Sequence, residues 1–321
     1  MEAKPLMGYN TVKRKWSRKR LHELIFYSLF MAWPVIQFCV FYIAVNTNSI
    51  LLAFKQYDTL TGKYTFIGFD NFKNFVSDIA MGGSPLYYGM RNSLILFGLE
   101  LLFGIPLALL FSFSIYKKML GWRVFRVVLF LPSIISGIVI VLIFQYFVNN
   151  AIPELVLSLF GIRMEGFLDM PETRLGTIFF YNIFFSFGFR VLMYSSAMSR
   201  IPEELVEYGA LDGLTHLKEF WHLTLPLIYP TITAFFVLNI AGIFTDQASI
   251  YSFFGDEPRD STIYTIGYYL FIRVQSTKAA VGGLRYYPYA SAGGLFCTLI
   301  AAPLTLFARW VFEKFGPDAE F

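Results

Sequence analysis

Long apolar runs alternate with shorter polar stretches along the 321-residue chain. At about 1.5 Å of helical rise per residue, each run is long enough to cross roughly 30 Å of hydrocarbon. The runs lack the strict apolar–polar alternation of membrane strands, and a helix pairs its own backbone groups in lipid. The pattern therefore predicts an all-α membrane protein with six transmembrane helices, at residues 24–45, 93–115, 124–148, 175–197, 227–250 and 291–312.

The composition supports a membrane location. Hydrophobic residues make up 56% of the chain and charged residues 15%, whereas a soluble domain carries about 25% charged residues. A chain of this length cannot enclose so much apolar surface in water, so a lipid bilayer is the expected surrounding. The net charge of +4 is small, and the basic residues stand beside apolar runs, so no nucleic-acid partner is expected.

Lysine and arginine gather at three places next to the apolar runs, which are the N-terminal segment, the short loop between spans two and three, and the C-terminal end. By the positive-inside rule, these places face the cytoplasm. The basic N-terminal segment 1–23 and the C-terminal end are therefore both expected to be cytoplasmic, and the loop 198–226 between spans four and five lies on the same side. The whole of 1–321 is expected to form a single transmembrane domain. The loops expected to face outward are 46–92, 149–174 and 251–290.

The loop 198–226 is too polar to cross a membrane, yet its apolar residues recur at helical spacing. Gly213 interrupts this helical stretch, and a second short stretch leads to Pro226. The pattern predicts two short helices, joined by a glycine elbow and lying flat under the membrane. The apolar stripe of the first helix consists of Leu205, Tyr208, Leu211 and Leu214.

This loop resembles the cytoplasmic signature of the permeases of binding-protein-dependent ABC importers. In that family a Glu-Ala-Ala triplet is followed, at fixed spacing, by a glycine and then by Leu-Pro. Glu207, Gly213 and Pro226 stand at the corresponding positions of this chain. Tyr208 and Gly209 depart from the pattern, because alanines are usual there.

Further stretches resemble the carbohydrate-type branch of the same family, and the resemblance covers most of the chain. Asp212 before the elbow glycine matches the sugar-type branch, and the tail resembles the last helix of permeases that handle complex oligosaccharides. The resemblance implies a multi-pass permease of the bacterial cytoplasmic (inner) membrane that imports a carbohydrate, specifically an oligosaccharide. The segments that carry it, besides the loop, are 51–58, 66–75, 131–150 and 287–316.

The resemblance also implies a division of labour between subunits. This chain would move cargo by alternating access and would not itself be an enzyme. Two partner subunits would bind ATP and Mg and hydrolyse the ATP, and an extracytoplasmic solute-binding protein would deliver the cargo. A second permease would complete a heterodimer, with a homodimer of this chain as the alternative. No cofactor is expected in this chain. The residues expected to couple it to an ATP-hydrolysing subunit are Glu207, Tyr208, Gly209, Asp212, Gly213, Leu225 and Pro226.

Polar residues inside the spans are candidates for substrate contact, because in lipid they usually face a cavity or another helix. Amides and carboxylates pair with sugar hydroxyls, and aromatic rings cover the apolar faces of a sugar. Hydrogen bonding between helices explains the polar members equally well. Arg190, toward the cytoplasmic end of its span, is expected to extend its charge to the interface. The substrate candidates are Asn182, Ser186, Phe189, Asn239, Asp246 and Gln247.

Several chemistries have no pattern in this sequence. It contains no Gly-rich phosphate loop, no metal-ligand spacing among its three histidines and no nucleophile elbow. The alternatives that remain are an ABC permease for another small solute and a gradient-driven secondary transporter. The second alternative predicts inverted repeats or several acidic residues deep in the spans, and only Glu100 and Asp246 come near that requirement.

Overall fold

The computed structural model describes residues 18–256, 260–275 and 282–317. The chain divides into two units, Met1–Leu51 and Leu52–Phe321, which are described separately.

The described part of the first unit is one long apolar helix. Its segments are α1 (Arg18–Gln37), the π-helical η1 (Phe38–Ala44) and the start of α2 (Val45–Leu52). Side chains from His22 to Leu51 are exposed within the chain. This helix is apolar on all sides, and none of its sides is buried within the chain. Such a helix suits direct contact with lipid or with another chain. This helix contains the predicted first span.

The second unit is almost entirely helical, apart from a two-stranded antiparallel hairpin. At the hairpin turn, the backbone N–H of Leu60 and the hydroxyl of Thr61 donate to the carboxylate of Asp58 and lower its pKa. The first elements are β1 (Lys55–Asp58), β2 (Lys63–Phe66), α3 (Asp70–Ala80), α4 (Pro85–Leu99), η2 (Glu100–Gly104), α5 (Ile105–Tyr116), α6 (Trp122–Ile134), α7 (Gly137–Tyr146), η3 (Phe147–Ala151), α8 (Ile152–Phe160) and α9 (Pro171–Met198). The later ones are α10 (Glu203–Leu211), α11 (His216–Glu219), η4 (Phe220–Thr224), α12 (Leu225–Leu227), α13 (Tyr229–Gly242), α14 (Ile250–Phe254), η5 (Ser261–Ile263), α15 (Ile266–Gln275) and α16 (Gly282–Phe315).

Within the described residues, five helices are long and apolar enough to cross a membrane, or six if a pair bent by 70° counts as one span. The all-α membrane class predicted from the sequence is therefore confirmed. The single helices are His22–Leu52, Pro85–Tyr116, Gly137–Phe160, Pro171–Met198 and Tyr286–Phe315, and the bent pair is His216–Leu227 with Tyr229–Gly242.

The predicted limits of the third span are wrong. The sequence predicted one helix over 124–148, but α6 ends at Ile134, and Ile135 is extended before a new helix begins at Gly137. Pro132 lacks an N–H donor, and the Ser136–Gly137 pair has low helix propensity, so the break falls where backbone pairing is weakest. The apolar helix that follows continues through η3 and α8 to Phe160.

The predicted extent of the fifth span, 227–250, is also wrong. α13 ends at Gly242, and the chain then turns through left-handed conformations at Ala248 and Ser249 before α14 begins. Polar groups stabilise this turn, since the carboxylate of Asp246 accepts from the N–H of Ala248 at 2.8 Å. A side chain that bonds nearby backbone groups offers the chain an alternative to the helix.

Three of the π-helical segments share one feature, which is a proline two residues after their last residue. η2 is followed by Pro106, η3 by Pro153 and η4 by Pro226. A proline removes one helical donor and its ring crowds the carbonyl four residues earlier. A single wider turn relieves that contact and re-pairs the backbone, as a helix in lipid requires.

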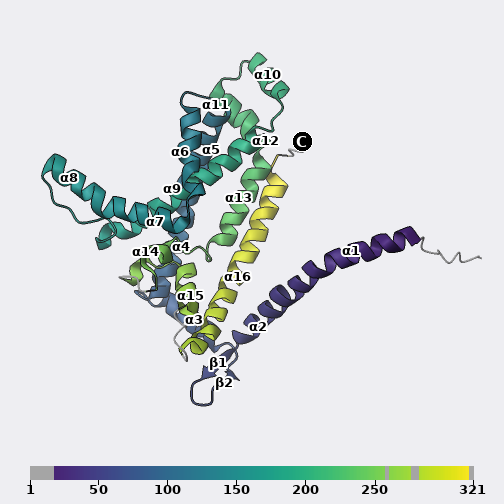
Figure 1. Ribbon diagram of the computed structural model, residues 1–321, viewed down its shortest axis with the longest axis vertical. Helices are drawn as coiled ribbons and strands as arrows, with labels where there is room; N and C mark the ends of the chain where they lie inside the picture. Colours follow the sequence, from purple (N-terminus) through teal and green to yellow (C-terminus); the bar gives the residue numbers. More distant parts are fainter. Residues whose placement is uncertain (1–17, 257–259, 276–281, 318–321) are drawn as a thin grey trace, which may run out of the picture. The chain divides into compact units, whose positions relative to one another are not determined.

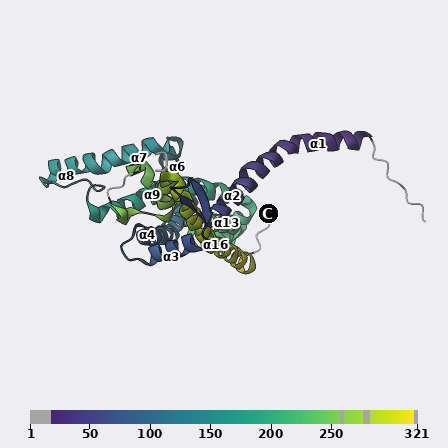
Figure 2. The same cartoon turned by 90° about the horizontal axis from the view of Figure 1, so that it is seen from below.

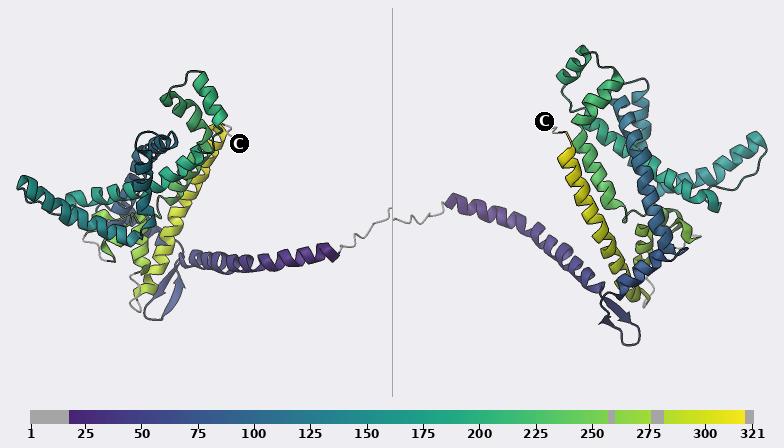
Figure 3. Two further views of the ribbon diagram at one scale, coloured as in Figure 1. Left: turned by 45° about the horizontal axis from the view of Figure 1, so that its top comes forward. Right: turned by 180° about the vertical axis from the view of Figure 1, so that it is seen from behind.

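The second unit has distinct ends. Figure 1 shows α10 at one end, near the last turns of α16, and the hairpin with α3 at the other. In both views of Figure 3, α13 and α16 run side by side along this length. Figure 2 shows α7 and α8 as a continuous arm that extends beyond α9. The loop predicted to be cytoplasmic therefore lies at the opposite end from α3, which belongs to a segment predicted to face outward.

Helices α5, α6 and α9 pack against one another in the second unit. Buried apolar residues from α5 and α9, including Phe113, Val191 and Tyr194, form one continuous cluster with Phe220 of the loop. Gly188 of α9 faces the backbone of α6 at Leu129 without room for a side chain. A small residue at such a crossing allows two membrane helices to approach closely.

Candidate functional site: the loop after α9 and an intramembrane polar pocket

The loop after α9 folds as two short helical stretches separated by a glycine. α10 ends at Leu211, and Gly213 adopts a left-handed conformation with φ of +78°. The N–H of Gly213 bonds to the carbonyl of Ala210, and the N–H of Leu214 bonds to the carbonyl of Gly209. A left-handed residue at a helix end is usually glycine, because it has no Cβ to crowd the backbone. The predicted elbow is therefore present.

Much of this loop is exposed within the chain. The side chains of Tyr208, Leu211 and Trp221 are 66%, 83% and 59% exposed. Glu207, Asp212 and Gly213 are also exposed, whereas Gly209 is buried against Leu214. Because an apolar surface of this kind is rare on a soluble face unless it binds something, the loop has the features of a docking surface.

An ion pair fastens the loop to the end of span two. Nζ of Lys117, just after α5, lies 2.8 Å from a carboxylate oxygen of Glu219 on α11. Their side chains are 17% and 7% exposed. Beside them the ring of Phe220 packs on Phe113 of α5, with centroids 5.1 Å apart. Sequence reasoning missed this anchor, because Lys117 and Glu219 lie far apart in the sequence and no local pattern links them.

A second feature is a polar pocket of about 290 Å³ inside the membrane-spanning part of the second unit. It is lined from three directions by η2 with the end of α4, by α9, and by α13 with the turn after it. Glu100 forms an ion pair with Arg190, and a guanidinium nitrogen of Arg190 lies 3.5 Å from Oδ1 of Asn239. Nδ2 of Asn239 is buried with no hydrogen-bond partner among the described residues.

Three of the six predicted substrate residues lie in or beside this pocket, and the other three do not. Asn239 and Asp246 line this pocket, and Ser186 donates to the Glu100 carboxylate at 3.3 Å. Asn182 instead stabilises the turn after α13, since its Nδ2 donates to the carbonyl of Ala248 at 2.7 Å. The remaining two, Phe189 and Gln247, do not line the pocket.

The expectation that Arg190 extends to the membrane interface is wrong. Its side chain is 11% exposed and is held by Glu100. A charged side chain deep in a bundle requires a partner of opposite charge, and Glu100, on another span, provides it. Their separation by 90 positions explains why no local pattern indicated the pair.

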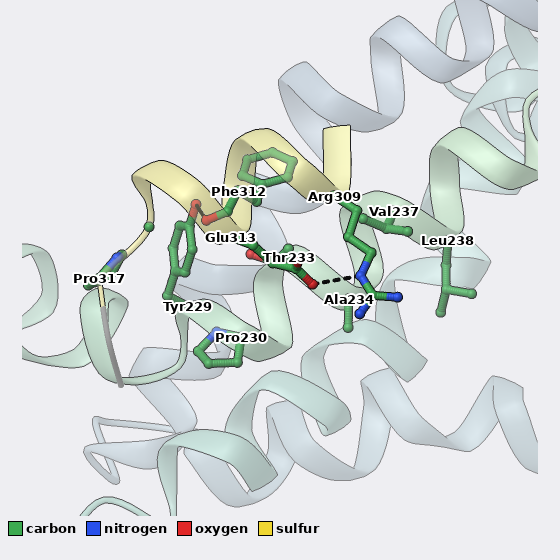
Figure 4. A pocket seen from close by; sticks show the side chains of 11 residues that line it. Tyr229, Pro230, Thr233, Ala234, Val237, Leu238, Arg309, Phe312, Glu313 and Pro317 are labelled. Carbon is green, nitrogen blue, oxygen red and sulfur yellow. Dashed lines mark hydrogen bonds and ion pairs between the residues drawn. The ribbon is translucent and has the colours of Figure 1, made fainter. Parts of the chain in front are cut away.

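A larger pocket of about 610 Å³ lies between α13 and the last turns of α16 (Figure 4). Its wall is mainly apolar, with Val237, Leu238 and Phe312 among the lining residues. Arg309 and Glu313 form an ion pair at 2.6 Å within it. No residue predicted to contact substrate lines this pocket, and its apolar wall suits a hydrocarbon or a helix better than a sugar. Within the described ranges, no group of three or more His, Cys, Asp or Glu side chains lies close enough to hold a metal ion.

Residues 100–320 match the family described as the binding-protein-dependent transport system inner membrane component. The chain belongs to this family. The match covers more than half of the chain, including the loop with its glycine elbow and most of the residues that line the polar pocket.

Known relatives agree with this assignment. Protein LplB of Bacillus subtilis is 26% identical over 287 residues, which cover 85% of this chain and 84% of LplB. The multiple sugar-binding transport system permease protein MsmF of Streptococcus mutans is 27% identical over 239 residues, covering 73% and 79%. A chain in the crystal structure of a bacterial alginate ABC transporter, in complex with an alginate pentasaccharide-bound periplasmic protein, has a TM-score of 0.74 at 24% identity, covering 92% of this chain and 96% of that one.

The permease is therefore a multi-pass inner-membrane subunit of an ATP-driven importer that depends on a solute-binding protein. ATP is bound by a partner subunit. The permease itself is a transport component and not the catalytic one. Family membership decides against a gradient-driven secondary transporter. The predictions of family, transport role and membrane location are confirmed. The individual site residues remain predictions, now with a position in the structure.

The Lys117–Glu219 pair allows a direct test of the loop anchor. Replacing Glu219 with alanine leaves the charge of Lys117 without its partner, at a cost of about 1–3 kcal/mol. We expect binding-protein stimulation of ATP hydrolysis by the assembled importer to fall about fivefold or more, since fivefold represents roughly 1 kcal/mol, the lower end of that cost. The control is Lys218→Ala, because Lys218 is an exposed neighbour on the same short helix. The charge-exchanged Lys117→Glu/Glu219→Lys variant should recover part of the loss, and equal behaviour of Glu219→Ala and Lys218→Ala would contradict the anchor.

Proposed function

We propose that the permease imports a carbohydrate, specifically an oligosaccharide, by alternating access, and that the loop 198–226 couples its spans to ATP hydrolysis on a partner. Two similarities support the cargo class. MsmF carries a sugar-transport name, and the alginate transporter is an importer of an acidic polysaccharide with the same fold. The observation that carries the coupling role is the exposed apolar surface of the loop beyond a rigid glycine elbow.

The structure supports a mechanical path from the loop to the spans. The Lys117–Glu219 pair and the Phe113–Phe220 contact tie α11 and η4 to the end of α5. The loop then continues through Pro226 into α13 across a 70° bend. Movement of the docked loop would therefore reach spans two and five together. Coupling through rigid elements of this kind is typical of transport driven by subunit closure.

Each predicted coupling residue takes one of two roles in this scheme. Glu207, Tyr208 and Asp212 are exposed and would contact the ATP-hydrolysing subunit. The others shape the loop. Gly209 allows Leu214 to pack against α10, Gly213 makes the elbow, and Leu225 with Pro226 begins α12, which precedes the bend into span five.

The polar pocket would form this subunit's share of the translocation pathway. Its ionisable lining groups are Glu100, Arg190 and Asp246. Because Glu100 neutralises Arg190, the remaining charge is the Asp246 carboxylate, which suits hydroxyl donors of a sugar. Nδ2 of Asn239, which has no partner among the described residues, would add a donor. A second, related permease in a heterodimer would supply the opposite wall, and two ATP-binding subunits would complete the importer.

The cargo proposal is tested by reconstituting the importer in lipid with its binding protein and a panel of oligosaccharides, amino acids and phosphate. We expect an oligosaccharide, and not the other solutes, to raise ATP hydrolysis and to accumulate in the vesicles. Glu207→Ala should weaken coupling. Gly213→Val should abolish it, because a β-branched residue does not tolerate φ of +78°. Stimulation by an amino acid or by phosphate instead would establish the alternative, a permease for another small solute.

A further inference from the structure

A third pocket lies far from the loop, at the opposite end of the second unit. It has a volume of about 270 Å³ and lies among β1, α3, α15 and the first turns of α16. All four segments belong to the loops predicted to face outward, and Figure 1 places α3 and α15 away from α10. Neither the coupling loop nor the intramembrane pocket shares a residue with it.

Aromatic rings form part of this pocket. Tyr269, Tyr286 and Tyr289 all line it, and the guanidinium of Arg273 lies 5.1 Å from the centroids of both Tyr269 and Tyr286. Rings that remain partly open at a wet surface offer an apolar face together with a polar edge. Tyr286 is 36% exposed, so part of its ring remains open to a ligand beside the Arg273 guanidinium.

Planar polar groups form the rest of the wall. Nδ2 of Asn71 donates to the carbonyls of Ala53 and Lys55 at 2.9 and 2.8 Å, which fixes the amide and leaves its Oδ1 without a described donor. The amide of Asn74 makes no hydrogen bond to a described residue and lines the same wall. Asp78 accepts from the hydroxyl of Tyr289, which orients the carboxylate.

The charges of the pocket balance, because Asp78 and Arg273 are its acidic and basic groups among the lining residues. The guanidinium of Arg273 lies over the rings of Tyr269 and Tyr286 rather than against a described carboxylate, and its N–H groups can donate to a ligand. Acceptor oxygens, the amide of Asn74, the guanidinium of Arg273 and the partly exposed ring of Tyr286 match the alternating hydroxyls and apolar faces of a neutral pyranose. The volume is near the lower end of the roughly 300–1,000 Å³ of drug-sized sites, which suits one sugar ring rather than a whole oligosaccharide.

We propose that this pocket is a carbohydrate-binding site on the extracytoplasmic face of the permease, which holds one neutral pyranose unit of the cargo as it leaves the solute-binding protein. The inference rests on the proposed carbohydrate cargo and adds a recognition site outside the membrane. Tyr286 stacks on the ring of the sugar. Asn74, Asp78 and Arg273 bind its hydroxyls.

The test measures sugar binding by the assembled importer in lipid nanodiscs, without its binding protein. The probes are maltotriose, xylotriose and raffinose, followed by saturation-transfer NMR. We expect at least one of these trisaccharides to bind, and Asn74→Ala and Arg273→Met each to weaken its binding about three- to tenfold, as loss of one net hydrogen bond does. Lys73→Ala is the matched control, because Lys73 is the exposed neighbour of Asn74 on α3 and does not line the pocket. Arg273→Lys, which keeps the charge and the packing of the stem, serves as a second variant if Arg273→Met lowers the thermal unfolding midpoint.

The failure of this inference is distinguishable from the failure of the proposed function. Absence of trisaccharide binding, or equal binding by Asn74→Ala and Lys73→Ala, overturns the site, while sugar-stimulated transport would still support carbohydrate import. If no carbohydrate stimulates transport, the proposed function fails in its own assay. If Asn74→Ala and Arg273→Met weaken docking of the empty binding protein but leave sugar binding unchanged, the pocket is a protein contact and the inference is overturned.

Discussion

Replacing Glu100 with leucine is expected to lower the free energy of unfolding of the permease by about 3–5 kcal/mol. The reason is not the loss of an attraction by itself. Arg190 is 11% exposed and its charge is paired with Glu100, so the variant leaves a buried guanidinium with no opposite charge. A charge taken out of water loses its hydration, which makes an unpaired charge here far more costly than at a surface.

The measurement is the thermal unfolding midpoint of the purified permease, together with the yield of folded protein. Glu100→Leu and Arg190→Met should each lower both quantities. The double variant Glu100→Leu/Arg190→Met should recover most of the stability, because apolar side chains of similar size can replace a buried pair. Glu172→Ala, an exposed acid at the start of the same helix α9, should stay within about 0.5 kcal/mol of the wild type. A double variant no more stable than the single ones would contradict this explanation.

Stability and transport should separate in the double variant. Arg190 and Glu100 both line the intramembrane pocket, and Arg190 lies beside Asn239. The double variant should therefore fold and yet transport cargo more slowly, because the pocket loses polar groups on two of its walls. Wild-type transport by a folded double variant would show that the pair is purely structural.

The substitution Gly188→Ala is expected to have the second-largest effect, lowering the free energy of unfolding by about 1–3 kcal/mol or more. A Cβ built on Gly188 would lie 1.9 Å from the carbonyl oxygen of Leu129 and 2.9 Å from its carbonyl carbon. Both atoms belong to the backbone of α6, so no side-chain rotation relieves the overlap. The two helices must move apart, and well-packed interiors resist such shifts.

The same helix contains a matched control. Gly176 of α9 is also helical, and a Cβ there would meet no atom within 4 Å. Gly176→Ala should leave the unfolding midpoint unchanged or raise it, since alanine is favoured over glycine in a helix by up to about 1 kcal/mol. If Gly176→Ala and Gly188→Ala shift the midpoint equally, the effect reflects helix propensity and not the crossing of α6 and α9.

Local sequence patterns predicted the class of fold, the membrane location and the glycine elbow. A membrane helix needs about 20 apolar residues in a row, and this requirement is visible in the sequence without knowledge of any neighbour. The elbow was equally predictable, because a helical stretch that stops at Gly213 has a local cause. Helices such as Pro85–Tyr116 and Pro171–Met198 therefore include the predicted ranges 93–115 and 175–197 entirely.

Local patterns failed where a break within an apolar run depends on hydrogen bonds. The turn after Gly242 reads as a continuation of the span by composition, since Ile243 and Phe244 are apolar. Its stability comes from Asp246 within the turn and from Asn182, which lies on another helix and holds the carbonyl of Ala248. A contact between residues 66 positions apart leaves no periodic signal.

The sequence by itself determined that the chain lies in a lipid bilayer and which loop carries the family signature. Both depend on residues that are near one another in the chain. Only the tertiary structure decided which polar residues meet. It brought Glu100 to Arg190, Lys117 to Glu219, and Asn74 to the tyrosines of α15 and α16. Charges and amides find their partners across helices, and the packing that brings them together is set by the buried surfaces of whole spans rather than by any local run of residues.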